Sequence, residues 1–140
     1  MNTYNINDQE FVNSTTYQNF LDENPGRGRL RIRANSASEA VPVSGVEIVV
    51  SKIIDNNNVI FFEGVTNESG VIERISLPAP LTDPNNLDVP NTTSYDVKAT
   101  YTPNNFSLLT SVNMYDDVCV IQIINIAPDM NIRAGGSNGR

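Results

Sequence analysis

The sequence predicts an all-β fold, a seven-stranded Greek-key β-sandwich, and three observations lead to this prediction. Residues 28–34 alternate arginine with apolar side chains over one strand's length, which is typical of a strand with one buried face. Two runs rich in β-branched and aromatic residues, 59–62 and 71–75, flank a four-residue turn at 67–70. Further strand-like runs recur at short spacing as far as residue 126, as in a small sandwich.

The turn at 67–70 is interpreted as the reversal of the domain's central hairpin. Asn67 and Ser69 favour side-chain bonds to the backbone, and Gly70 tolerates a positive φ. Besides 28–34, strands are predicted at residues 46–53, 59–62, 71–75, 94–101, 106–112 and 118–126. The last of these is almost continuously apolar, so we expect it to be the most buried.

Four arginines form the one concentrated basic feature of an acidic chain: Arg27, Arg29, Arg31 and Arg33. The alternation projects them together from one face of the predicted strand. One interpretation is a solvated strand face whose charges protect an edge from unwanted pairing. The other is a docking stripe for a carboxylate-rich partner, including an acidic loop of another copy.

Residues 1–27 are predicted to form an N-terminal arm with a short helix at 15–23. Ser14 or Thr15 is a candidate N-cap, and residues 24–26 read Asn-Pro-Gly, a stop signal. An extended segment laid on a neighbouring molecule is the alternative to the helix. Apolar residues are scattered along residues 1–13 without a clean period, whereas Tyr17, Phe20 and Leu21 fit one face of the short helix. The candidate anchors of this assembly arm are Tyr4, Ile6, Phe11, Val12, Tyr17 and Phe20.

Charge and composition restrict the partners that we expect. The 140 residues are 39% hydrophobic, enough for one core, and the net charge of −7 argues against nucleic acid and anionic membranes. No apolar run reaches the roughly 18 to 20 residues of a membrane span, and the first residues lack signal-peptide features. We therefore expect no nucleic-acid partner, no membrane insertion and no signal peptide.

Catalytic and metal-binding signals are sparse. The chain has no histidine, and its single Cys119 lies in an apolar run that predicts a buried, inert thiol, with an intermolecular disulfide as the alternative. Paired acids at 116–117 and at 83 and 88 are interpreted as solvated turn residues. We expect no enzyme and no cofactor. A Ca²⁺ site is the alternative, with oxygen ligands drawn from Asp55, Asn56, Asn58, Asp83, Asp88 and Asp116.

The order of these signals resembles a known family. Residues 28–32 (GRLRI), 41–48 (VPVSGVEI), 64–72 (GVTNESGVI), 77–78 (LP) and 95–99 (YDVKA) together resemble the carboxypeptidase regulatory-like, or transthyretin-like, β-sandwich family. The resemblance covers residues 28–127, which are predicted to form the sandwich domain, with 128–140 as a C-terminal tail. It implies a non-catalytic module of secreted and surface proteins, of the kind seen in Gram-positive spore-formers and their phages.

Two chemistries found on this fold are weighed against the sequence. Some adhesin modules form a Lys–Asn isopeptide bond, for which only Lys52 and Lys98 could supply the amine here. The resemblance places Arg, which cannot form that bond, where those modules carry the lysine of the first strand. The transthyretin-like purine-pathway hydrolase depends on histidine, which this chain lacks.

From these features we expect a non-enzymatic structural subunit that self-assembles or docks through its terminal arm into a surface, fibre, spore or virion assembly. Its partners would be other copies of itself, in a homo-oligomer or filament, or another structural protein. The alternative is a monomeric binding or adhesion module for cell-wall carbohydrate or a host surface. Both interpretations place the protein at a surface or outside the cell.

Overall fold

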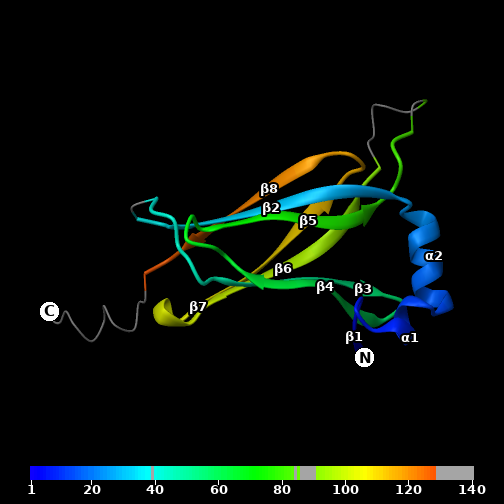
Figure 1. The fold of residues 1–140 in the computed structure, drawn as a ribbon, viewed down its shortest axis with the longest axis horizontal. Coiled ribbons are helices and arrows are strands. Elements are labelled where there is room, and N and C mark those ends of the chain that lie inside the picture. Colours follow the sequence, from blue (N-terminus) through cyan, green and yellow to red (C-terminus); the bar gives the residue numbers. More distant parts are fainter. Residues whose placement is uncertain (39, 84, 86–90, 129–140) are drawn as a thin grey trace, which may run out of the picture.

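The chain folds into two β-sheets that pack face to face, as seen in a computed structural model that describes residues 1–38, 40–83, 85 and 91–128 (Figure 1). The larger sheet has the strand order β1-β4-β3-β6-β7, and the smaller sheet has the order β5-β2-β8. The strands are β1 (Thr3–Asn5), β2 (Gly26–Ser36), β3 (Glu47–Ile54), β4 (Asn57–Val65), β5 (Val71–Ala79), β6 (Thr93–Tyr101), β7 (Phe106–Met114) and β8 (Cys119–Ile126). The helices are α1 (Gln9–Val12), α2 (Thr15–Glu23) and the short 3₁₀ helix η1 (Thr102–Asn104).

The all-β sandwich predicted from the sequence is confirmed, with a difference in strand number. Each of the seven predicted strands is present as one of β2 to β8. The additional strand is β1, which pairs in parallel with β4 through a register that aligns Tyr4 with Val59. Three residues without an alternating pattern give no strand signal, so only the partner strand identifies β1.

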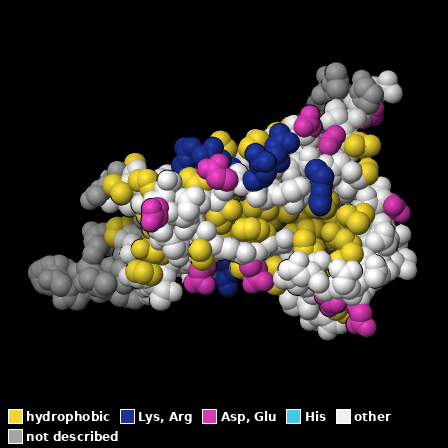
Figure 2. Space-filling view, viewed as in Figure 1, with side chains coloured by type: hydrophobic (Ala, Val, Ile, Leu, Met, Phe, Trp, Pro, Cys, Tyr) yellow, Lys and Arg dark blue, Asp and Glu magenta, His cyan; other side chains and the backbone are white. Residues whose placement is uncertain are grey.

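The core lies between the two sheets, where the inward side chains of both layers meet. Leu30 and Ile32 of β2 are fully buried, as are Ile48 of β3, Val97 of β6 and Ile124 of β8. All five belong to one hydrophobic cluster. Each such side chain stabilises the fold by about 1.5–3 kcal/mol relative to exposure. Figure 2 shows hydrophobic side chains as a band between the two layers.

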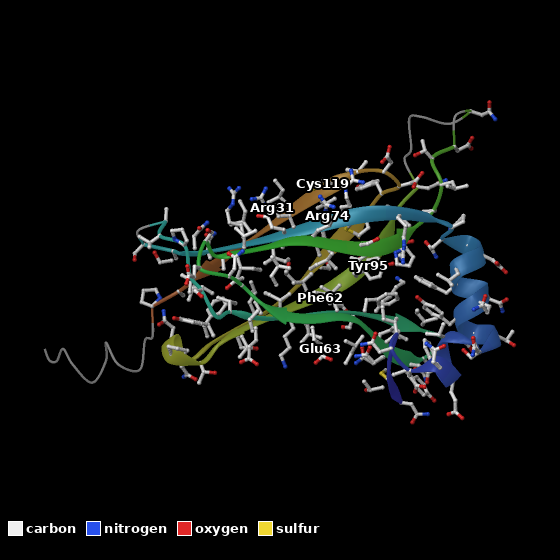
Figure 3. All side chains as sticks on the ribbon, in the orientation of Figure 1. Arg31, Phe62, Glu63, Arg74, Tyr95 and Cys119 are labelled. Atoms are coloured by element: carbon white, nitrogen blue, oxygen red, sulfur yellow. The ribbon has the colours of Figure 1, made fainter. Side chains whose placement is uncertain are left out.

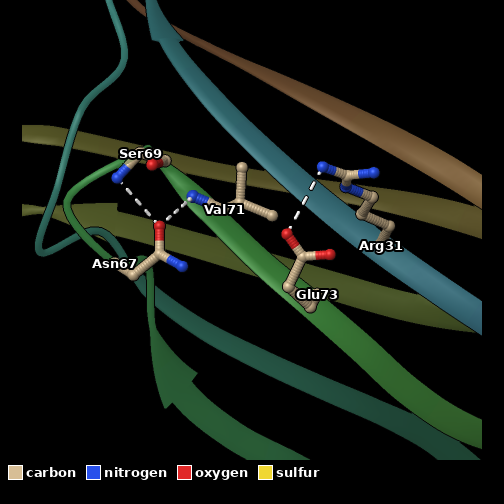
Figure 4. Close-up of polar contacts among 5 residues, drawn as sticks. All are labelled: Arg31, Asn67, Ser69, Val71 and Glu73. Atoms are coloured by element: carbon tan, nitrogen blue, oxygen red, sulfur yellow. Dashed lines mark hydrogen bonds and ion pairs between the residues drawn. The ribbon is translucent and has the colours of Figure 1, made fainter.

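The turn at Asn67 forms as predicted, but the hairpin interpretation is wrong. The Asn67 side-chain oxygen accepts hydrogen bonds from the backbone N–H groups of Ser69 (2.9 Å) and Val71 (3.1 Å), as Figure 4 shows. Gly70 has a φ of +74°, and a Cβ there would lie 2.5 Å from the Ala34 carbonyl oxygen. The strands on either side enter different sheets, since β4 pairs with β3 and β1 while β5 pairs with β2. The turn therefore carries the chain from one layer to the other.

The hairpin with a tight turn is β3–β4. Asp55 and Asn56, with φ of +47° and +65°, both lie in the left-handed region. Two such residues match the backbone of the turn that suits the right-handed twist of paired strands. The asparagine-rich loop at 55–58 thus reverses the chain within the larger sheet.

Residues 1–23 pack on the sandwich, which corrects the expectation of a free arm. The α2 helix covers the residues over which the sequence predicts a helix, and the Ser14 hydroxyl caps it by accepting from the Tyr17 N–H at 3.3 Å. The aromatic side chains of this segment reach the core: Phe11 is 5% and Phe20 is 6% exposed. Burial of these rings holds the segment on the chain's own sheet, across the end of the sandwich in Figure 1.

Candidate functional site

The outer face of the smaller sheet carries the arginine row, defined as Arg27, Arg29, Arg31 and Arg33 of β2. Along β2 the arginines alternate with fully buried residues, so the four side chains leave the same face of the sheet. Arg74 of β5 lies on the same side as Arg31 in Figure 3. Figure 2 shows the basic side chains gathered along this side of the molecule. Five of the chain's nine basic residues therefore meet on one face, although the net charge is −7.

Three carboxylates and one backbone hydrogen bond contact the arginine row. The Arg29 guanidinium lies 3.6 Å from the Asp117 carboxylate, and that of Arg31 lies 3.4 Å from Glu73 (Figure 4). The backbone N–H of Arg27 donates to the Asp116 carboxylate at 3.1 Å, and that of Asp117 donates to the Arg27 carbonyl at 2.8 Å. The side-chain ion pairs are longer than ideal charge-assisted bonds and exposed to water, so each contributes about 0–1 kcal/mol. The guanidinium groups are therefore available to another carboxylate.

Arg31 has an unsatisfied donor. Its Nε atom is buried, and within the described residues no hydrogen-bond partner reaches it. A buried N–H without an acceptor costs about 1–3 kcal/mol.

The β8 row, defined as Cys119, Ile121 and Ile123, lies beside the arginine row on the same face. The parallel register places Cys119 beside Arg29, Ile121 beside Arg31 and Ile123 beside Arg33. Ile121 is 51% and Ile123 is 47% exposed. Two half-exposed isoleucines next to four arginines form a surface of the composition found at protein interfaces.

This exposure corrects two predictions. The strand predicted to be the most buried exposes alternate residues, and the Cys119 thiol, predicted to be buried, is exposed. The reason is strand order: β8 is the edge of a three-stranded sheet whose outer face no described element covers. Its continuous apolar run made both faces look buried. The strand's position at an edge depends on pairing with β2, which periodicity does not reveal.

The predicted anchors of the assembly arm lie within the chain's own structure. Phe11, Tyr17 and Phe20 are buried, and Tyr4, Ile6 and Val12 pack against the same cluster. The Tyr4 ring stacks on Phe11 at 4.8 Å, and Phe20 meets Phe61 of β4 at 5.8 Å. These side chains join the N-terminal segment to the sandwich.

Burial perturbs three titratable groups: it raises the pKa of Tyr17 and of Tyr95 and lowers the pKa of Lys52. Burial raises the pKa of Tyr95 well above its usual range, with Tyr17 adding to the rise and Arg27 opposing it. The Tyr95 hydroxyl donates to the Pro78 carbonyl, which ties β6 to β5 across the layers. Burial lowers the pKa of Lys52, and Asp96 offsets part of that effect.

The Lys52 amine is held in a way that does not resemble an isopeptide site. It donates to the Ser94 carbonyl at 2.8 Å and lies 5.7 Å from the centre of the Tyr95 ring. Its described partners are thus a backbone oxygen and an aromatic face. The side chain of Lys98, the other candidate amine, is exposed on β6.

The candidate Ca²⁺ ligands are spread over the molecule. Asp55, Asn56 and Asn58 lie at the β3–β4 turn, Asp116 lies beside Arg27, and Asp88 lies outside the described residues. Within the described ranges, no three His, Cys, Asp or Glu side chains form a group that could hold a metal ion. A cavity of about 230 Å³ opens between α2 and the β3–β4 turn. Its lining consists of Thr16, Asn19, Phe20, Glu23, Ile54 and Asp55.

No helix in the described part of the chain is both long and apolar enough to cross a membrane.

Comparison with known proteins gives a likeness of fold. No protein-family model matches the chain, and no curated protein matches it in sequence. Among solved structures, 5-hydroxyisourate hydrolase of Klebsiella pneumoniae matches with a TM-score of 0.46 and 19% sequence identity. The match covers 72% of this chain and 90% of that chain. The fold of this chain, as its own two sheets show, is a β-sandwich.

The comparison also corrects the expected function. The sequence analysis expects a non-enzymatic structural subunit, whereas the matched structure is that of a hydrolase. Self-assembly through an arm also fails on physical grounds, because the predicted anchors are packed within this chain. The structural-subunit prediction and the prediction of no enzymatic activity are therefore both set aside. A likeness at 19% identity and a TM-score of 0.46 assigns no catalytic residue to this chain.

Proposed function

We propose that this chain is a binding module that docks a carboxylate-bearing protein partner on the outer face of its smaller sheet. The observation that carries the proposal is the arginine row beside the exposed β8 row, on a chain of net charge −7. A basic and apolar face on an otherwise acidic protein steers an acidic partner to one place.

Arginine chemistry supports a carboxylate as the recognised group. The planar guanidinium presents paired N–H donors that match the two oxygens of a carboxylate. The chain's own Asp117 and Glu73 already occupy this position at 3.6 and 3.4 Å. A partner would exchange these weak, hydrated contacts for drier ones, and Ile121 and Ile123 would supply the apolar part of the interface.

The setting of the module is part of the same proposal. The resemblance to carboxypeptidase regulatory-like modules supports action at a surface or outside the cell, as in proteins of spore-formers and their phages. Immunodetection of the protein in surface and culture fractions of its source cells tests this. Detection confined to the interior would contradict it.

The test of the binding function is titration of the ¹⁵N-labelled full chain with hexaglutamate, followed by NMR. We expect shifts that concentrate at β2 and β8 and at the arginine side-chain Nε resonances. The R31Q/R33Q variant should weaken binding about tenfold, which corresponds to about 1.4 kcal/mol. K98Q/K52Q removes the same charge from the larger sheet and serves as the matched control.

Equal weakening by the two double variants would overturn the proposal, because binding would then follow net charge alone. An absence of shifts at millimolar hexaglutamate would also overturn it. Shifts centred on the cavity beside α2 would assign the binding role to a different site.

A further inference from the structure

The outer edge of β8 presents unpaired backbone groups. β8 pairs with β2 on one side, where the Val118 carbonyl accepts from the Arg29 N–H and the Ile126 carbonyl from the Ala37 N–H, both at 2.9 Å. In a parallel ladder, backbone groups of alternate residues point to opposite sides within the sheet. Residues 119, 121, 123 and 125 therefore direct their N–H and C=O groups to the other side. Among the described residues, no strand pairs with that side.

This edge lacks the usual protection against pairing. Natural edge strands carry charges, prolines or bulges that prevent addition of another strand. The β8 sequence, CVIQIINI, contains no charged residue and no proline. Its register with β2 is continuous over eight residue pairs. The described protection is one side-chain contact, from the Gln122 amide to the Ile123 carbonyl at 3.1 Å.

The opposite sheet shows strand addition within this same chain. β1 adds to the β4 edge in parallel, with the Asn58 N–H donating to the Asn2 carbonyl at 2.8 Å and the Ile6 N–H donating to the Ile60 carbonyl at 3.1 Å. A three-residue strand is enough there because neighbouring aromatic side chains hold it. At β8 the neighbouring groups are the β8 row and the arginine row.

We propose that an extended acidic segment of a partner protein adds to β8 as a fourth strand of the smaller sheet, an inference that rests on the proposed binding function. The backbone of residues 121 and 123 supplies the ladder bonds. Side chains of the segment on the outer face lie next to Ile121 and Ile123. Carboxylates at those positions attract the long arginine side chains of β2, the strand on the other side of β8. The segment therefore alternates carboxylate and β-branched side chains.

Amide hydrogen exchange of the full chain, with a capped decapeptide of alternating valine and aspartate, tests this. In the free protein we expect fast exchange at Ile121 and Ile123 and slow exchange at Val120 and Ile124, which face β2. The peptide should slow exchange at Ile121 and Ile123 at least tenfold. Absence of this protection at saturating peptide would overturn strand addition.

A second peptide separates strand addition from docking by side chains. Methylation of alternate backbone nitrogens removes ladder donors and leaves every side chain unchanged. We expect this peptide to bind at least tenfold more weakly to the full chain. If it binds as tightly as the parent peptide, strand addition is wrong, whereas the arginine-face function stands as long as R31Q/R33Q still weakens hexaglutamate binding.

The Ile121→Pro variant provides the matching change in the protein. Its lost N–H faces the free edge, so the ladder with β2 should persist. Binding of the valine–aspartate peptide should fall at least tenfold while the exchange pattern at Val97 in the core is unchanged. Undiminished binding by the folded variant would overturn the proposal, and the methylated peptide decides the matter if the variant does not fold.

Discussion

The β4 edge of the larger sheet is covered by residues 1–23, whereas no described strand covers the β8 edge of the smaller sheet. Both edge strands carry aromatic or β-branched residues that favour pairing. At β4 the chain satisfies the edge itself, with β1 and the rings of α1 and α2. At β8 it leaves apolar side chains exposed next to the arginine row. The β4 edge is therefore paired within the chain, whereas the β8 edge is open to a partner strand.

The largest expected effect comes from loosening the covered edge. Phe20→Ala should lower the free energy of unfolding by about 3–4 kcal/mol, because it removes a buried ring and leaves a cavity beside Phe61. Ile121→Thr at the free edge is the contrasting variant and should change it by no more than about 0.5 kcal/mol. Urea denaturation measures both. Similar losses in the two variants would show that β8 is as buried in solution as α2.

Alkaline pH tests how well the core around Tyr95 excludes water. Burial raises the pKa of Tyr95 in the folded state. The stability that the protonated Tyr95 contributes is therefore fully present below the pKa of tyrosine in the unfolded chain, about 10, and is lost as the pH rises above it. The unfolded chain releases the proton first, and stability should therefore fall by about 1.4 kcal/mol per pH unit above pH 10. Urea denaturation between pH 8 and 11 measures this slope.

Two phenylalanine variants test whether Tyr95 causes the loss of stability above pH 10. Tyr95→Phe should reduce it, and should also lose the hydrogen bond to Pro78 at every pH, at a cost of about 1 kcal/mol. Tyr101→Phe keeps Tyr95 and should leave the slope in place. A slope that is unchanged in Tyr95→Phe would contradict a dry environment around that hydroxyl.

The smallest expected effect concerns the ion pair between Arg31 of the arginine row and Glu73 of β5. Glu73→Gln removes the carboxylate 3.4 Å from Arg31 and should change stability by less than about 0.5 kcal/mol. The same change should strengthen hexaglutamate binding about twofold, since the competing intramolecular carboxylate is gone. Isothermal titration calorimetry measures the affinity. Glu63→Gln makes the same charge change on the larger sheet, and an equal gain there would refute the competition.

Local signals predicted the arginine row and the Asn67 turn, because both depend on neighbours in sequence. The alternation around Arg29 and Arg31 requires only a two-residue repeat, and the Asn67 side chain bonds to a backbone two and four residues away. The sheet that each flanking strand joins depends on distant partners. The turn was therefore predicted, whereas the hairpin on either side of it was wrong.

The dependence of strand pairing on distant residues also explains the wrong predictions at the β4 and β8 edges. The helix that carries Phe20 was predicted, but its packing partner was not, because Phe61 of β4 is distant in the sequence. The apolar run of β8 predicted burial on both faces, whereas strand order exposes one face. Ile121 and Ile123 were missed as candidate site residues for this reason. Their signal is an uncharged apolar strand beside a strongly basic one.

The proposed binding face is built from strands that are distant in the chain. Arg27 of β2 contacts Asp116, which is 89 residues later, and β8 follows that contact. During synthesis at roughly 5–20 residues per second, β2 waits several seconds for the strand that lies beside it. A nascent or shortened chain that lacks β8 carries the arginines without the isoleucines. A nascent chain would therefore bind the partner only after β8, which ends at Ile126, has been synthesised.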